Sequence, residues 1–298
     1  MTPESVFITS GHVARFTDFM VTCEKEDMSY RADKLLEEWC EKRLADDKAP
    51  LKPEERAEIE KVERDAGAMN AEQLKTWFTK FALKSPEGNP LSDPFPFNLM
   101  FKSQIGPSGK VVGYLRPETA QGMFVNFKRL LEINSGKMPF AAAQIGTANR
   151  NEIAPRQGLL RVREFTLAEI EHFVHPDDKR HANFADIASL PLLLLPRAAQ
   201  EKGEMAAQKI QASVAVSEKI INNETLAYFM ARTQLFLIAC GIKEEKLRFR
   251  QHKATEMAHY ASDWSDLRPQ HCSGAGFWPS LRLGFAHMSV SAVAFSPV

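Results

Sequence analysis

The chain has no excess of charge of either sign. Its 38 Lys and Arg residues balance its 38 Asp and Glu residues, so the formal net charge is zero. A protein that binds nucleic acid over a broad surface needs a basic excess to neutralise phosphates. The balance excludes such a footprint for the chain as a whole. Any contact with nucleic acid is therefore expected to be local, or to involve parts outside this sequence.

Cysteine is scarce and long apolar runs are missing. The four cysteines (Cys23, Cys40, Cys240 and Cys272) form no Cys-x-x-Cys pair, which favours reduced thiols that serve packing. Reduced thiols fit a reducing compartment. No stretch approaches the roughly 18 apolar residues of a membrane span. The leucine-rich segment 190–196 is short and contains proline, so it is expected in a core.

The remaining composition is ordinary for a soluble globular protein. Hydrophobic residues make up 44% of the 298 positions and charged residues 26%. This length suits one large domain or two small ones. The N-terminus lacks the basic, apolar and small-residue order of a signal peptide.

One stretch of twenty residues is rich in functional groups. Arg150 and Glu152 lie two residues apart, and Arg161, Phe165 and Glu169 lie four apart. Even spacings fall on one face of a strand, and the Pro-Arg-Gln-Gly between the two groups indicates a turn. The pattern predicts a hairpin that presents guanidinium groups, an aromatic ring and carboxylates. Such a face suits the phosphates and base of a nucleotide and an amine-bearing partner.

Two alternatives stay open on spacing alone. A step of four also aligns residues on one face of a helix. A solvated hairpin face with paired charges would show the same pattern without any ligand.

The stretch resembles motif 2 of the class II aminoacyl-tRNA synthetases: Arg-x-Glu, a loop, then Arg-x-x-x-Phe-x-x-x-Glu. The surrounding sequence resembles glycyl-tRNA synthetases of the eukaryotic, homodimeric type, from about residue 2 to about residue 262. The segments that carry this resemblance are GYLRPETAQG (113–122), AQIG (143–146), IAPRQGL (153–159), EIEHF (169–173), LRFRQH (247–252) and EMAHYA (256–261). One position departs from the family: the residue before Arg150 is usually aromatic, and here it is Asn149.

The resemblance implies activation of glycine with ATP to glycyl-adenylate and transfer to tRNA(Gly). Arg150 would be the catalytic residue, bridging the glycine carboxylate and the α-phosphate, while Glu118 and Glu169 would bind the glycine ammonium group. The implied ATP-binding residues are Arg150, Asn151, Glu152, Arg161, Val162 and Phe165. The resemblance also implies Mg²⁺ at the phosphates, a homodimer, no membrane partner, and a cytoplasmic location with room for an organellar pool.

Two neighbouring features have simpler explanations. Glu118 follows Pro117 and could be a carboxylate favoured by a helix N-terminus. His172 and His175 lie near Glu169 and Glu171 in the sequence, which resembles the grouping of metal ligands. Their spacing favours structural histidines, so no metal ligand is expected.

The implied fold is α+β: a class II synthetase catalytic core with a mainly antiparallel sheet backed by helices, and incomplete. Residues 1–262 would form a partial catalytic domain with helical insertions at 31–84 and about 176–222. Asn70 with Gln73 three residues later predicts a helix start. Gly136 and Gly241 predict helix ends.

The last 36 residues differ in kind. From Asp263 on there are four charged residues and no clear hydrophobic period, and the resemblance ends there. We expect an atypical, poorly ordered and non-homologous tail at 263–298. Most of the family's motif 1, its motif 3 and its anticodon-binding domain have no counterpart in this sequence. The chain is therefore expected to be inactive or weak as a ligase. The alternative is a non-catalytic synthetase-like fragment that binds ATP, tRNA or a protein partner.

Overall fold

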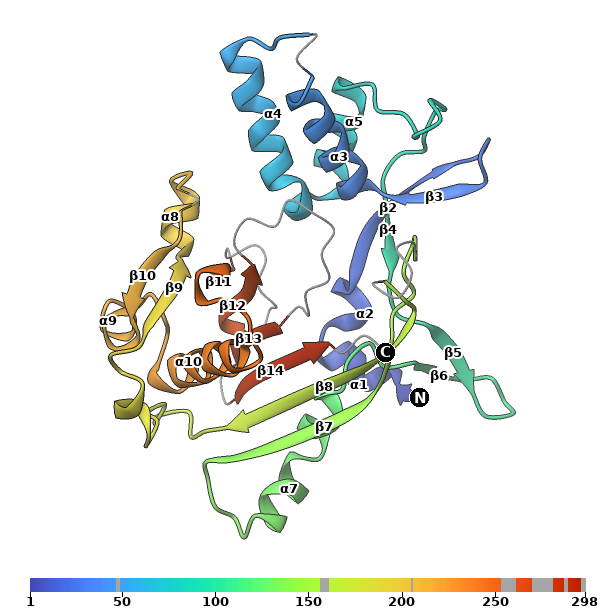
Figure 1. The fold of residues 1–298 in the computed structure, drawn as a ribbon. Helices are drawn as coiled ribbons and strands as arrows, with labels where there is room; N and C mark the ends of the chain where they lie inside the picture. Colours follow the sequence, from blue (N-terminus) through green and yellow to red (C-terminus); the bar gives the residue numbers. More distant parts are fainter. Residues whose placement is uncertain are drawn as a thin grey trace. The chain divides into compact units, whose positions relative to one another are not determined.

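The chain folds into two compact units (Figure 1). This computed structural model describes residues 1–46, 49–155, 161–204, 206–252, 261–269, 281–286 and 289–295. Unit 1 comprises Met1–Pro117 and Asn149–Arg163, and unit 2 comprises Glu118–Ala148 and Glu164–Val298. The chain thus divides within the densest motif region.

Unit 1 contains two small antiparallel sheets and a group of helices. Its strands are β1 (Thr2–Pro3), β2 (Thr17–Cys23), β3 (Met28–Arg31), β4 (Phe95–Asn98), β5 (Lys102–Ile105) and β6 (Val111–Tyr114). Its helices are α1 (Glu4–Thr9), α2 (His12–Arg15), α3 (Ala32–Leu44), α4 (Pro53–Asp65), the 3-10 turn η1 (Ala66–Ala68) and α5 (Ala71–Lys80). The sheet orders are β1-β6-β5 and β3-β2-β4, so β2 and β6 are central strands.

The helices α3, α4 and α5 agree with the helical prediction for residues 31–84. Their apolar faces pack together with β2 around a core that includes Val21, Leu36, Ile59 and Leu74, all buried. The start of α5 has the predicted capping box: the Asn70 side chain accepts from the backbone N–H of position 73, whose side chain accepts in return. This exchange satisfies two N–H groups that a helix start leaves unpaired.

Unit 2 is built on an eight-stranded sheet. Its strands are β7 (Phe140–Asn149, whose last residue belongs to unit 1), β8 (Glu164–Phe173), β9 (Pro191–Leu195), β10 (Gln208–Gln211), β11 (Leu247–Gln251), β12 (Ala261–Pro269), β13 (Leu281–Ala286) and β14 (Ser289–Phe295). The order is β10-β9-β11-β12-β13-β14-β8-β7. Strands β9 and β11 run parallel, whereas β10–β9, β11–β12, β12–β13, β13–β14 and β14–β8 are antiparallel. This confirms the predicted α+β class with a mainly antiparallel sheet.

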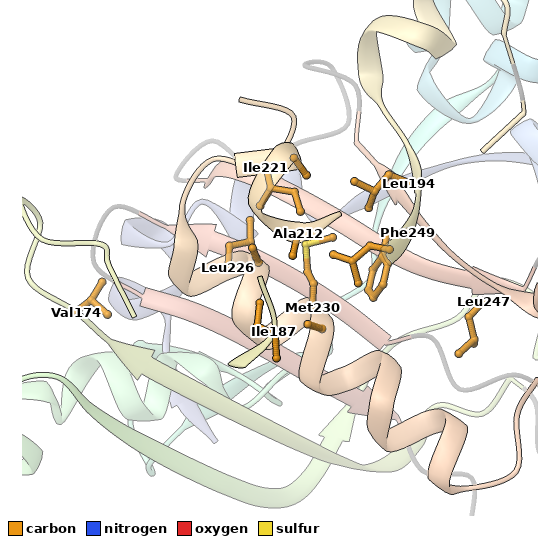
Figure 2. Close-up of a cluster of buried hydrophobic side chains, with 13 residues drawn as sticks. Val174, Ile187, Leu194, Ala212, Ile221, Leu226, Met230, Leu247 and Phe249 are labelled. Carbon is orange, nitrogen blue, oxygen red and sulfur yellow. The ribbon is translucent and has the colours of Figure 1, made fainter. Parts of the chain in front are cut away.

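The core of unit 2 lies where its longest helix meets one end of the sheet. The helices of unit 2 are α6 (Ala120–Val125), α7 (Phe127–Ile133), η3 (Phe184–Asp186), α8 (Arg197–Glu201), α9 (Ala212–Ser217), α10 (Glu224–Ala239) and η4 (Glu244–Lys246). Leu226 and Met230 of α10 pack with Leu194 of β9 and Phe249 of β11, and all four are buried (Figure 2). Helix α10 ends where predicted, because Gly241 adopts a left-handed φ of 92° that a side chain would disfavour.

The segment 176–222 differs from its prediction as a helical insertion. It contains two strands, β9 and β10, alongside the short helices α8 and α9. Leu192, Leu194 and Leu195 of β9 are buried as expected, and Leu193 is half-buried. A short continuous apolar run fits a buried strand and a buried helix equally well, so periodicity could not separate the two. The parallel pairing of β9 with β11 shows that this apolar run is a strand.

The segment expected to form a poorly ordered tail contains strands. The backbone of β12, β13 and β14 occupies the sheet positions between β11 and β8. Strand pairing joins residues far apart in sequence through main-chain hydrogen bonds, which a local hydrophobic period does not report. The poor order and the lack of homology expected for 263–298 both stay predictions.

Among the helices in the described parts of the chain, none combines the length and apolar character needed to cross a membrane.

The core of unit 2 generates a stability prediction. Replacing Leu226 by Ala should lower the free energy of unfolding by about 2–5 kcal/mol, because the lost side chain leaves a cavity in a close-packed core. Leu235→Ala is the control, since Leu235 is on the same helix but 37% exposed, whereas Leu226 is fully buried. The control should cost about 1 kcal/mol or less. Urea unfolding followed by circular dichroism measures both, and equal losses would contradict the assigned core.

Candidate functional site

The backbone around Arg150 turns away from the strand that precedes it. The N–H of Arg150 donates to the Arg163 carbonyl at 2.9 Å, and the N–H of Glu152 donates back to the Arg150 carbonyl at 2.8 Å. Between them, the N–H of Asn151 donates to the Leu99 carbonyl at 2.7 Å. The predicted strand through Arg150 and Glu152 therefore ends one residue before Arg150. Because Asn151 bonds to a different segment, the ladder cannot continue.

The side chain of Arg150 is held by two groups of unit 1. Its Nε donates to the Pro117 carbonyl at 3.3 Å, and its guanidinium carbon lies 5.5 Å from the centre of the Phe16 ring. A cation over an aromatic face is attracted by the ring quadrupole. The family's aromatic neighbour is absent at Asn149, whose backbone N–H donates to the Arg116 carbonyl. Phe16 is thus an aromatic partner of Arg150 that sequence reasoning missed, since nothing local links residue 16 to this motif.

Arg163 anchors the main chain of the same turn. Its Nε and Nη2 donate to the Glu152 carbonyl at 3.3 and 3.1 Å. Its acceptor is thus a backbone oxygen of the turn itself. Arg161 and Val162, also predicted to bind ATP, are half-buried in the same unit. The turn residues 156–160 lie outside the described part of the chain.

A half-buried carboxylate of β2, Asp18, interacts electrostatically with Glu152 and Arg161 of the motif. Asp18 pairs with Arg31 (Oδ2 to Nη1, 2.9 Å), and Arg31 also forms a two-pronged contact with Asp33 at 3.1 and 2.6 Å. Burial raises the pKa of Asp18, Arg31 lowers it, the negative charges of Asp33 and Glu152 raise it, and Arg161 lowers it again. Asp18 therefore contributes to the charge environment of Glu152 and Arg161. It stands in no motif, so sequence reasoning passed over it.

Strand β8 in unit 2 settles the period of the second half of the motif. Because β8 is extended from Glu164 to Phe173, Phe165 and Glu169 lie on the same face of a strand. The alternative that these residues share one face of a helix is therefore wrong for this segment. Leu167 lies between them and is buried, and Phe165 packs against it and Ala148. Glu169 and Glu171 on this face are 2% and 0% exposed. A strand face that buries two carboxylates is unusual enough to indicate function.

Glu169 is tied to the start of helix α6. Both the backbone N–H and the hydroxyl of Thr119 donate to Glu169 Oε2. Burial raises the pKa of Glu169, the charge of Glu118 raises it further, and the hydrogen bonds from Thr119 partly offset both. Beside it, Gln121 Nε2 donates to Glu118 Oε1 at 2.6 Å. The structure thus brings together Glu118 and Glu169, the two predicted glycine-binding carboxylates, and adds Thr119 and Gln121.

The histidines near this strand lie among aromatic rings. Burial lowers the pKa of His172, and the charge of His181 lowers it further. The ring centre of His172 lies 4.9 Å from that of Phe229. The His181 ring stacks on Tyr228 at 3.6 Å. Within the residues that the structure describes, no group of three His, Cys, Asp or Glu side chains could hold a metal ion.

Comparison with known proteins places the chain in a class. Residues 110–195 match the family described as the tRNA synthetase class II core domain (G, H, P, S and T). The chain belongs to the class II tRNA synthetases. Within this class it is homologous to the glycine–tRNA ligases, as the following relatives show.

Three curated relatives each align with 89% of this chain. The putative cytoplasmic glycine–tRNA ligase of Arabidopsis thaliana is 51% identical over 267 residues, which cover 57% of that protein. The glycine–tRNA ligase of Drosophila melanogaster is 53% identical over 268 residues, 34% of its length. That of Caenorhabditis elegans is 51% identical over 269 residues, 36% of its length. The predicted resemblance is confirmed, and the chain spans between one third and three fifths of these relatives.

The buried carboxylate Glu169 generates a pH prediction. Its raised pKa means that the folded state binds its proton more tightly than the unfolded state, so its contribution to stability is present below the ordinary value of 4.5 and is lost as pH rises through the folded pKa. Glu169→Gln removes this loss. The variant should therefore exceed the wild type in free energy of unfolding at about pH 7.5, and the gap should close as pH falls below 4.5.

The control is Glu164→Gln, an exposed position on the same strand. Its stability should follow the wild type within about 0.5 kcal/mol at each pH. Urea unfolding across this pH range measures both variants. A gap between Glu169→Gln and wild type that grows on acidification would contradict the assigned environment of Glu169.

Proposed function

We propose that this chain is part of a glycine–tRNA ligase, which activates glycine with ATP to glycyl-adenylate and transfers the glycyl group to tRNA(Gly). The observation that carries the proposal is homology at about half identity to glycine–tRNA ligases over 89% of the chain, with the motif arginine Arg150 retained. The local geometry of the arginine turn and of the paired carboxylates supports it.

The chemistry explains why an arginine at this position matters. A glycine carboxylate oxygen attacks the α-phosphorus of ATP, the new P–O bond forms, and pyrophosphate leaves with the electrons of the broken P–O bond. Both reactants are anions, so the protein must cancel charge and align them. Arg150 would neutralise charge on the carboxylate and the α-phosphate in the transition state. The substrate carboxylate is itself the nucleophile, so no protein base is required.

The remaining ATP contacts follow the motif. Asn151, Glu152, Arg161 and Val162 would bind ATP, with Glu152 accepting from the adenine amino group and Arg161 contacting the phosphates. Phe165 would stack on adenine. The hydrogen bonds that fix the main chain of Arg150 and Glu152 support a preorganised arginine turn, which reduces the reorganisation needed when ATP binds.

Glycine would be recognised at the start of helix α6. Glu118 and Glu169 would bind its ammonium group. A cation there offsets the cost of holding the charge of Glu118 close to the buried carboxylate of Glu169. Larger amino acids would be excluded by steric filling of the side-chain space, which discriminates better than a single methylene contact worth about 1–3 kcal/mol.

Mg²⁺ and the macromolecular partners belong to the same proposal. A Mg²⁺ cage needs several oxygen ligands, and the described residues provide no three-membered group of carboxylates or histidines. Mg²⁺ would enter with ATP as part of the substrate, bound to its phosphates. A homodimer, tRNA(Gly) as acceptor and a cytoplasmic location, with an additional organellar pool, complete the proposal.

Glycine-dependent exchange of pyrophosphate into ATP tests the proposal. The wild-type chain should show exchange, at a low rate, that requires glycine. Arg150→Ala should reduce the rate by about 10²–10³, the usual effect of removing one charge-stabilising donor. Arg180→Ala is the control, because Arg180 is exposed and pairs with Asp178. It should leave the rate unchanged.

Two outcomes would contradict the proposed function. Exchange that proceeds equally with alanine in place of glycine would remove the assigned substrate. Absence of glycine-dependent exchange, with ATP binding retained in calorimetry, would favour the non-catalytic synthetase-like fragment instead.

A further inference from the structure

Gln121 carries a buried side-chain amide next to the two carboxylates Glu118 and Glu169 of unit 2. It lies in the first turn of α6 and is 8% exposed, so more than nine-tenths of it is buried. Its Nε2 donates to Glu118 Oε1 at 2.6 Å. Its Oε1 is buried as well and has no hydrogen-bond partner within the described part of the chain. Buried polar atoms are nearly always paired, so this oxygen calls for a donor.

The orientation of the amide follows from its neighbour. If the oxygen and nitrogen were exchanged, Oε1 would face an acceptor oxygen of Glu118 at the same short distance, and two acceptors would meet without a proton. The hydrogen bond to Glu118 therefore fixes Oε1 as the atom that points elsewhere. It remains available to a donor that approaches the carboxylates.

Three acceptors consequently gather at one place. The chain from Glu118 to Gln121 is tied to strand β8, because Thr119 donates twice to Glu169. Glu118 and Glu169 are close enough for the charge of one to raise the pKa of the other. A primary ammonium group has three N–H donors and one positive charge. Its three N–H donors match two carboxylate oxygens and one neutral amide oxygen in number, and its positive charge is attracted to the carboxylates.

We propose that Gln121 is a substrate-binding residue whose Oε1 accepts one N–H of the substrate ammonium group, while Glu118 and Glu169 accept the other two. This inference rests on the proposed use of glycine. It assigns selectivity for a primary amine to Gln121. An N-alkylated glycine has fewer N–H donors and would leave one buried acceptor unpaired, which is the basis of strong discrimination in polar sites.

Calorimetric titration of the chain with glycine tests the role of the amide. Gln121→Met keeps the length of the side chain but removes the strong acceptor, and should weaken glycine binding by roughly tenfold to a hundredfold. Gln121→Glu should restore the acceptor. The neighbouring carboxylates favour the protonated form of the new side chain, which donates to Glu118 and offers a carbonyl oxygen to the ligand. It should bind glycine within a few-fold of wild type.

Gln234→Met is the matched control. Gln234 is another buried glutamine of unit 2, and its Nε2 donates to the Pro191 carbonyl at 3.0 Å instead of to a carboxylate. It should bind glycine as the wild type does. Equal weakening in Gln121→Met and Gln121→Glu, with both folded, would show that restoring a carbonyl acceptor at this position does not restore glycine binding, and would overturn the inference.

A second measurement needs no variant. The wild-type chain should bind N-methylglycine at least about tenfold more weakly than glycine, because one N–H is lost. Equal affinity for the two ligands would overturn the three-acceptor arrangement even if Gln121→Met fails to fold. If the wild type binds neither ligand, the proposed function falls together with this inference. If it binds glycine, and Gln121→Met binds glycine equally well, only the inference falls.

Discussion

Keeping the Glu169 carboxylate out of water is the constraint on which the arrangement of β8 and the start of α6 depends. Glu169 is almost fully buried on a strand, and such a group costs free energy unless donors or a cation compensate it. Thr119 supplies two donors, which ties the start of α6 to β8. That link also sets the positions of Glu118 and Gln121. The residual rise in the pKa of Glu169 indicates that the compensation by the protein alone is incomplete, as expected where a cationic substrate group completes the site.

The turn that contains Arg150 is positioned by main-chain hydrogen bonds instead of by a buried charge. Arg150 is positioned by leaving the sheet: the bond from Asn151 to Leu99 ends the ladder, and Arg163 secures the turn through the Glu152 carbonyl. The guanidinium donates to the Pro117 carbonyl and lies over the Phe16 ring. An arginine held in a fixed place is suited to a ligand that brings negative charge.

The sequence predicted the features that depend on local chemistry. The helices of 31–84, the capping box at Asn70 and the helix end at Gly241 each follow from a few adjacent residues. It could not predict partners that come from afar, such as Phe16 under Arg150 or Asp18 near Glu152. It did not predict the strands of 176–222, because pairing between distant segments decides whether an apolar run is extended.

By itself, the sequence determined the class of protein and the identity of the chemical groups, since motif residues and homology are properties of the chain. Tertiary structure alone decided how those groups are used. It showed that Phe165 and Glu169 share a strand face, that Arg150 lies beyond the end of its strand, and that Gln121 donates a hydrogen bond to Glu118 at the start of α6. The physical reason is that burial and hydrogen-bond partners depend on which distant segments pack together, and these two quantities set the charge and reactivity of each side chain.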